Sequence, residues 1–145
     1  MRDEILSIFE KNKIISGGDG IKYNSFFGAT SEDLPGVGKK EIIDEVHRME
    51  NDGLVKDGEN SVFLTDKGEQ EIYGVFDINK SKNELINEFK NFGSPLKEGI
   101  PFKSIESIRK DKLTPLTKKH FEEVLKECID KGLIEEMLNG YKLKN

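Results

Sequence analysis

The sequence is poor in the residues that build metal centres, disulfide frameworks and catalytic sites. It contains one cysteine, two histidines and no tryptophan among 145 residues. A single cysteine excludes an intramolecular disulfide, and no zinc-finger, metalloprotease or calcium-loop spacing occurs in the chain. Cys128 falls on a helical stripe of apolar residues, which predicts a buried thiol, whereas His47 and His120 are expected on helix surfaces. We therefore expect no enzymatic activity, no cofactor and no metal.

Long apolar runs are also missing from the chain. No stretch approaches the roughly 20 apolar residues that a membrane-spanning helix needs, and residues 1–13 are too charged for a signal peptide. Charged residues make up 35% of the sequence and hydrophobic residues 34%. This composition predicts a cytoplasmic protein that does not insert into a membrane.

The charges that are present divide the chain into two unequal halves. Residues 1–80 contain 10 basic and 17 acidic side chains, a net charge of −7. Residues 81–145 contain 13 basic and 11 acidic side chains, a net charge of +2. Such a difference indicates that the two halves have different partners, although surface drift without functional meaning gives the same pattern.

The chain repeats itself at a nearly constant spacing. Residues 3–9 resemble residues 83–89 at a spacing of 80, and residues 39–42 resemble residues 118–121 at a spacing of 79. Gly53-Leu54-Val55 likewise has a counterpart in Gly132-Leu133-Ile134. Ordered matches at one spacing indicate that a unit of about 65–75 residues occurs twice.

Each copy is predicted to contain three helices followed by a β-hairpin. Apolar residues recur at helical spacing in both copies, and Gly53 and Gly132 are expected to end the third helices in the left-handed conformation. In the first copy we expect helices over residues 2–13, within 24–34 and from 39 to 53, a hairpin of residues 54–56 and 61–64, and a connecting helix over 65–73. In the second copy we expect helices over residues 82–92 and 102–110, a third helix beginning near 118, and a hairpin of residues 133–135 and 140–143.

The stretch Leu34-Pro35-Gly36-Val37-Gly38-Lys39-Lys40 has three interpretations. A nucleotide-binding P-loop would need a glycine where Asp33 stands and a hydroxyl where Lys40 stands. The hairpin of helix-hairpin-helix DNA-binding modules is similar to the stretch, but it explains neither the later β-hairpin nor a second copy without these glycines. The third interpretation, a turn between two helices in which Pro35 ends the first one, agrees with both features.

Residues 36–68 resemble the recognition helix and wing of winged helix-turn-helix proteins, and residues 116–136 resemble a second copy of the same element. The resemblance implies an α+β fold, mainly α with small β-hairpins. It also implies two tandem winged-helix domains, over residues 1–75 and 79–145. Proteins of this superfamily bind double-stranded DNA, and the resemblance therefore implies a transcriptional regulator. Tandem winged helices also serve as protein–protein assembly modules without DNA binding, which is the alternative.

Basic residues are concentrated where a helix-turn-helix would contact DNA. Residues 101–119 carry a net charge of +4 across the predicted second helix, the turn and the start of the third helix. The candidate DNA-binding residues are Lys39, Lys40, Arg48, Lys103, Arg109, Lys110, Lys112, Lys118 and Lys119. A solvated helix surface with no ligand is the alternative for such a charge run. The acidic first copy is the poorer DNA reader, and it is expected to contact a protein partner or another copy of the chain.

Overall fold

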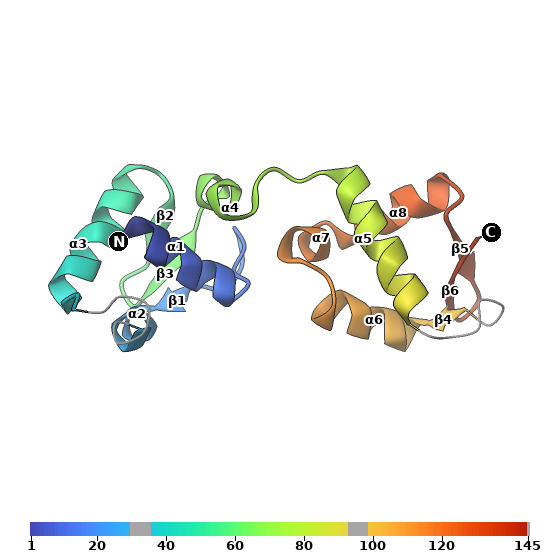
Figure 1. Cartoon of the computed structure of the whole chain (residues 1–145), viewed down its shortest axis with the longest axis horizontal. Helices are drawn as coiled ribbons and strands as arrows, with labels where there is room; N and C mark the ends of the chain where they lie inside the picture. Colours follow the sequence, from blue (N-terminus) through green and yellow to red (C-terminus); the bar gives the residue numbers. More distant parts are fainter. Residues whose placement is uncertain (30–35, 93–98, 145) are drawn as a thin grey trace. The chain divides into compact units, whose positions relative to one another are not determined.

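The computed structural model describes residues 1–29, 36–92 and 99–144. The chain divides into two compact units, Met1–Val75 and Phe76–Asn145, which we call unit 1 and unit 2. Each unit combines helices with a three-stranded antiparallel sheet, so the fold is α+β (Figure 1). No helix among these residues is long and apolar enough to cross a membrane.

Unit 1 has the order helix, strand, two helices, two strands and a last helix. Its sheet has the order β1-β3-β2, with Ile21 opposite Val62 and Val55 opposite Leu64. The elements are α1 (Arg2–Lys11), β1 (Ile21–Lys22), α2 (Tyr23–Ala29), α3 (Lys39–Asn51), β2 (Val55–Asp57), β3 (Ser61–Leu64) and α4 (Asp66–Tyr73).

The core of unit 1 forms where the helices turn their apolar stripes toward the sheet. Ile5 and Phe9 of α1 and Ile42 and Val46 of α3 are fully buried, as their helical spacing predicted. Gly53 follows α3 with a φ of 81°, a conformation that costs glycine no Cβ strain, and this confirms the predicted end of the helix.

Helix α4 is tied back onto the start of unit 1. The Thr65 side chain accepts a hydrogen bond from the Gly68 amide, which caps the helix. At its other end, the Tyr73 hydroxyl donates to the Ile14 carbonyl at 2.8 Å. The predicted connecting helix is thus confirmed, and its side chains belong to unit 1.

Unit 2 follows the order of unit 1 up to the hairpin, except that two helices, α7 and α8, stand where unit 1 has α3. Its sheet has the order β4-β6-β5, with Ile100 opposite Tyr141 and Ile134 opposite Leu143. The elements are α5 (Ile78–Asn91), β4 (Ile100–Pro101), α6 (Phe102–Asp111), α7 (Pro115–Lys119), α8 (Phe121–Asp130), β5 (Ile134–Met137) and β6 (Gly140–Leu143). The buried side chains of α5, α6 and α8 form a second hydrophobic core, which includes Leu85, Ile105 and Phe121.

The third helix of the second copy differs from the prediction because it is broken in two. The expected helix beginning near residue 118 was wrong: Lys118 and Lys119 end the short helix α7, and α8 begins at Phe121. His120 separates the two helices with φ −102° and ψ 23°, outside the helical region. Its ring stacks on Phe76 with a centroid distance of 4.0 Å, a contact that the local sequence pattern does not reveal.

Smaller differences lie at the ends of elements. Helix α5 begins four residues before the predicted position 82 because the Asp77 side chain caps it by accepting from the amides of Asn79 and Lys80. The prediction missed β1 and β4, which are two residues each. It also ended the first strand of the second hairpin at residue 135, whereas β5 continues to Met137. Residues 30–35, which complete the predicted second helix and begin the Leu-Pro-Gly-Val-Gly stretch, lie outside the described residues.

Candidate nucleic-acid interface

The candidate DNA-binding residues fall on three helices and one helix end. Lys39, Lys40 and Arg48 lie on α3 of unit 1. In unit 2, α6 carries Lys103, Arg109 and Lys110, Lys112 is the C-cap residue of α6, and Lys118 and Lys119 end α7. All of these side chains are exposed except that of Arg109, which is half-buried.

Unit 2 brings basic side chains from two helices to one hollow. Arg109 and Lys110 of α6 and Lys118 of α7 line a surface hollow of about 430 Å³, together with Glu106, Ser107 and Asp111. The Lys118 ammonium donates to the Lys110 carbonyl at 3.4 Å, which brings the end of α7 against the end of α6. The fold therefore joins cations that are eight residues apart in the sequence.

Arg109 is held in this hollow from several sides. Its guanidinium lies 3.6 Å from Glu122 of α8 and 3.8 Å from Glu106 of its own helix. It also lies over the Phe121 ring at 5.1 Å from the centroid, a cation–π geometry. Both carboxylates are exposed, so these ion pairs add little stability. Their effect is to orient the guanidinium and to compensate part of its charge.

Lys103 continues the row of basic side chains along α6. Lys103 precedes Lys110 by seven residues, which is two helical turns, so both lie on the same face of α6. At the start of α6 the Phe102 amide donates to the Asn139 carbonyl at 3.1 Å, and this places Lys103 next to the turn of the second hairpin. We use the term basic face of unit 2 for the six candidate cations of this unit, of which three line the hollow. They are Lys103, Arg109, Lys110, Lys112, Lys118 and Lys119.

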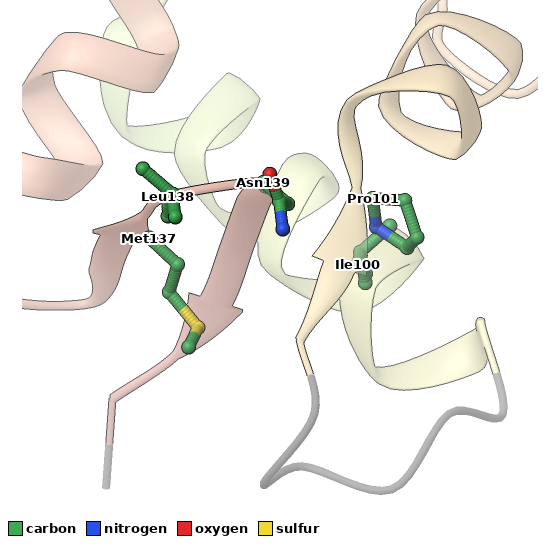
Figure 2. Close-up of a pocket in the computed structure, with 6 residues that line it drawn as sticks. Ile100, Pro101, Met137, Leu138 and Asn139 are labelled. Atoms are coloured by element: carbon green, nitrogen blue, oxygen red, sulfur yellow. The ribbon is translucent and has the colours of Figure 1, made fainter.

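A small apolar hollow lies at the turn of the second hairpin. Figure 2 shows Met137 and Leu138 on one side of it and Ile100 and Pro101 on the other. Its volume is about 160 Å³, and none of its lining residues is charged. Leu138 is 92% exposed at the two-residue turn. The hollow therefore does not add charge to the basic face of unit 2.

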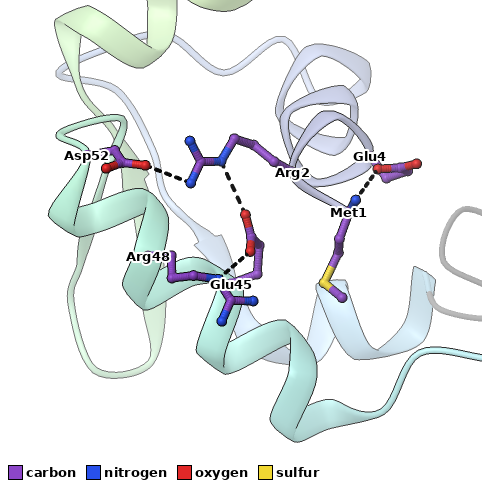
Figure 3. Close-up of polar contacts among 6 residues, drawn as sticks. All are labelled: Met1, Arg2, Glu4, Glu45, Arg48 and Asp52. Atoms are coloured by element: carbon purple, nitrogen blue, oxygen red, sulfur yellow. Dashed lines mark hydrogen bonds and ion pairs between the residues drawn. The ribbon is translucent and has the colours of Figure 1, made fainter.

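In unit 1, three cations on and beside α3 are engaged by neighbours of the same unit, namely Arg2, Lys39 and Arg48. Arg48 donates to Glu45 at 2.8 Å, and Glu45 also accepts from Arg2 at 3.2 Å. Arg2 in turn pairs with Asp52 at 2.7 Å, so the side chains form a chain of alternating charge (Figure 3). Lys39 lies over the Phe27 ring at 5.4 Å from the centroid.

Glu45 is the buried centre of this chain. Burial by itself raises the pKa of Glu45, but the hydrogen bonds from Arg48 and Arg2 outweigh it and hold the pKa below its ordinary value. The hydrogen bond that Arg2 donates to Asp52 is the main cause of the raised pKa of Arg2. Sequence reasoning missed Glu45, although its position gives a signal. It follows Ile42 by three residues and precedes Met49 by four, so it lies on the buried stripe of α3, where a carboxylate needs a cationic partner.

The α3 candidates are not gathered as those of unit 2 are. Arg48 follows Lys39 by nine residues, which is about 13 Å along a helix axis. Its guanidinium pairs with Glu45 at 2.8 Å and so belongs to the chain of ion pairs (Figure 3). The structure therefore separates the unit 1 candidates into two places.

Cys128 and His120 both pack against other side chains of unit 2. Cys128 is buried in the core of unit 2, and burial raises the pKa of its thiol to about 11, as expected for an apolar role. His120 is half-buried against Phe76, rather than fully exposed as the sequence predicted. Within residues 1–29, 36–92 and 99–144, no group of three or more His, Cys, Asp or Glu side chains is placed to hold a metal ion.

Comparison with known proteins gives no further constraint on this surface. No family model, no curated protein and no solved structure matches the chain.

Proposed function

We propose that this protein is a cytoplasmic, DNA-binding transcriptional regulator built from two tandem winged-helix domains, and that unit 2 makes the main DNA contact. The observation that carries the proposal is the joining of Arg109, Lys110 and Lys118 at one hollow. The order of three helices and a hairpin in unit 1, repeated in unit 2 with the third helix broken into α7 and α8, also supports the winged-helix interpretation. In unit 2 the basic face lies on the helices that would contact the phosphate backbone and lead into the groove.

The chemistry of the basic face favours phosphate contacts. Lys110 and Lys118 are exposed ammonium groups that would each neutralise a backbone phosphate, and Lys103 would continue this line toward the hairpin turn. The outer side of α8, in contrast, carries the exposed acids Glu123 and Asp130 beside Lys126. Carboxylates repel phosphates, so binding in this proposal depends more on charge than on base readout.

The alternative function is an assembly module that binds a protein through unit 1. The observation that favours it is the internal engagement of Arg2, Lys39 and Arg48, which makes these three cations less available to a phosphate. Both functions are compatible if unit 1 contacts a protein, or a second copy of the chain, while unit 2 contacts DNA.

A salt titration tests the proposed DNA binding. Fluorescence anisotropy of a labelled duplex should show binding at low salt, and the logarithm of the association constant should fall with the logarithm of salt concentration with a slope of about −3 to −5. Lys118→Glu should weaken binding about 10-fold and make the slope shallower by about one, because one phosphate contact is lost.

Lys131→Glu is the matched control for this titration. Lys131 is exposed at the opposite end of α8 from α7, so the same change in net charge there should alter affinity less than about 3-fold. If the wild-type chain shows no duplex binding at low salt and a protein partner is recovered instead, the assembly module replaces the DNA-binding proposal.

A further inference from the structure

The short helix α7 cannot be stable without external support. It contains five residues, Pro115–Lys119, and isolated helices of this length do not form in water. It nevertheless carries Lys118 and Lys119, which belong to the basic face of unit 2. Whatever holds α7 in place therefore decides where these cations point.

The start of α7 is supported by one carboxylate on α5. Glu84 accepts a hydrogen bond from the Thr114 amide at 2.6 Å and from the Thr114 hydroxyl at 2.8 Å. It accepts a third from the Thr117 hydroxyl at 2.7 Å. Thr114 is the N-cap residue of α7, but its own side chain makes no capping hydrogen bond. Glu84 thus satisfies groups at the start of α7 from a different helix.

The hydroxyl groups around Glu84 are arranged so that their protons point toward it. Thr117 has one hydroxyl proton and donates it to Glu84. The contact of 2.7 Å between the Ser81 and Thr117 hydroxyls must then have Ser81 as its donor. Thr117 is 1% exposed and Ser81 5%, so this chain of hydrogen bonds is shielded from water and rigid. An acceptor-only carboxylate completes it, whereas an amide at the same place would bring donors.

The other end of α7 is held by the residues that lead into α5. His120, which follows Lys119, stacks on Phe76 at 4.0 Å, and Phe76 lies two residues before α5. The segment from Phe76 to Glu84 therefore contacts both ends of α7.

Unit 1 lacks the two threonine hydroxyl groups that this support uses. At the repeat spacing of 79, Thr114 and Thr117 correspond to Pro35 and Gly38, which have no hydroxyl. At the spacing of 80, Glu84 corresponds to Glu4, which pairs with the Met1 amino nitrogen at 3.1 Å instead (Figure 3). This arrangement thus occurs in the copy that has the basic face. The other copy lacks the hydroxyl-bearing residues that it requires.

We propose that Glu84 is a positioning residue for DNA binding: its carboxylate fixes α7 so that Lys118 and Lys119 are presented on the basic face of unit 2. This inference rests on the proposed function. It reverses the direction in which a charge-removing mutation is expected to change the affinity for DNA. Removing a carboxylate near a DNA-binding surface normally strengthens binding, because a charge that repels phosphates is lost. Removing Glu84 should weaken it.

The test compares full-length Glu84→Gln with the control Glu88→Gln. Both variants lose one negative charge from α5, but Glu88 lies one turn further on and makes none of the contacts to α7. We expect Glu84→Gln to lower affinity for a labelled duplex about 3- to 10-fold, since the order of α7 is lost, and Glu88→Gln to leave it unchanged or slightly raise it. Thr114→Val removes an exposed hydroxyl without a charge change, and it should weaken binding in the same direction.

Amide hydrogen exchange without DNA provides a second readout. The amides of Lys118 and His120 donate within α7 at 2.9 and 3.1 Å, and their exchange should become about 10-fold faster in Glu84→Gln, while the core amides of α8 are unchanged. Uniformly faster exchange throughout unit 2 would mean general destabilisation and would overturn the positioning role.

The positioning role would also be overturned if Glu84→Gln and Thr114→Val bound DNA as well as the wild type. If the wild type binds no duplex, the proposed function and the DNA role of Glu84 both fall. The exchange data then decide independently whether Glu84 holds α7.

Discussion

Replacing Lys110 and Lys118 together by glutamate is expected to lower the affinity for duplex DNA about 100-fold at low salt. The two side chains line one hollow, and each reversal removes a phosphate contact and adds a repelling charge. Anisotropy titrations over a range of salt concentrations should also show a slope that is shallower by about two. This double change tests the basic face of unit 2 more severely than either single change, because the remaining lysine cannot take over the contact.

The matched control is Lys39→Glu with Lys40→Glu in unit 1. These lysines are adjacent at the start of α3, so the net charge of the chain changes by the same amount. We expect a loss of less than about 3-fold, since the acidic unit 1 already attracts DNA poorly. Equal losses from the two double variants would contradict the assignment of the main DNA contact to unit 2.

Glu45→Gln is expected to lower the free energy of unfolding of unit 1 by about 2 kcal/mol at pH 7. Removing one partner of a buried ion pair costs roughly 3–5 kcal/mol, because the other charge is left uncompensated. The cost is smaller here because the Arg2 and Arg48 side chains are 37% and 60% exposed and regain water. Glu41→Gln, an exposed change in the first turn of the same helix, should cost less than about 0.5 kcal/mol.

The pH dependence of this loss identifies its cause. The pKa of Glu45 is lower in the folded chain than its ordinary value of 4.5, so its ionised form stabilises the fold above that pH. This contribution disappears as the pH falls through the lowered folded pKa. The difference in the free energy of unfolding between wild type and Glu45→Gln should therefore shrink from pH 7 to pH 3. Urea unfolding measures this free energy, and hydrogen exchange of the α3 amides reports the part that belongs to unit 1. A deficit that stays constant over this range would point to packing rather than charge.

Helical periodicity and glycine positions were enough to predict most of the fold from the sequence. Ile42, Val46 and Met49 lie on one stripe of α3 and are all buried, since such an apolar stripe is removed from water only when the helix packs it into a core. The strands β1 and β4 could not be predicted in this way. Each has two residues, too few for an alternating pattern, and each exists because its partner strand offers a free edge.

The candidate site was predictable as a set of charges but not as an arrangement. Lys110 and Lys118 stand out in the sequence as part of a basic stretch, yet the hollow that they share is lined from both α6 and α7. Helix α7 in turn is contacted by Glu84 at its start and by the stack of His120 on Phe76 at its end. Those contacts join residues about 30 to 45 positions apart, and local patterns carry no information about them. The same holds for Arg48, whose pairing with Glu45 becomes visible only once the buried stripe of α3 is placed in the core.

The single thiol gives the chain a built-in reporter on one of its halves. Cys128 is enclosed by the core of unit 2, and its raised pKa keeps it protonated at neutral pH. A maleimide or disulfide reagent would react with Cys128 only after unit 2 opens, because only a solvated thiolate is a good nucleophile. The rate of this modification would measure the opening of unit 2 alone, without any engineered label. Bound DNA would lower the rate at which Cys128 is modified.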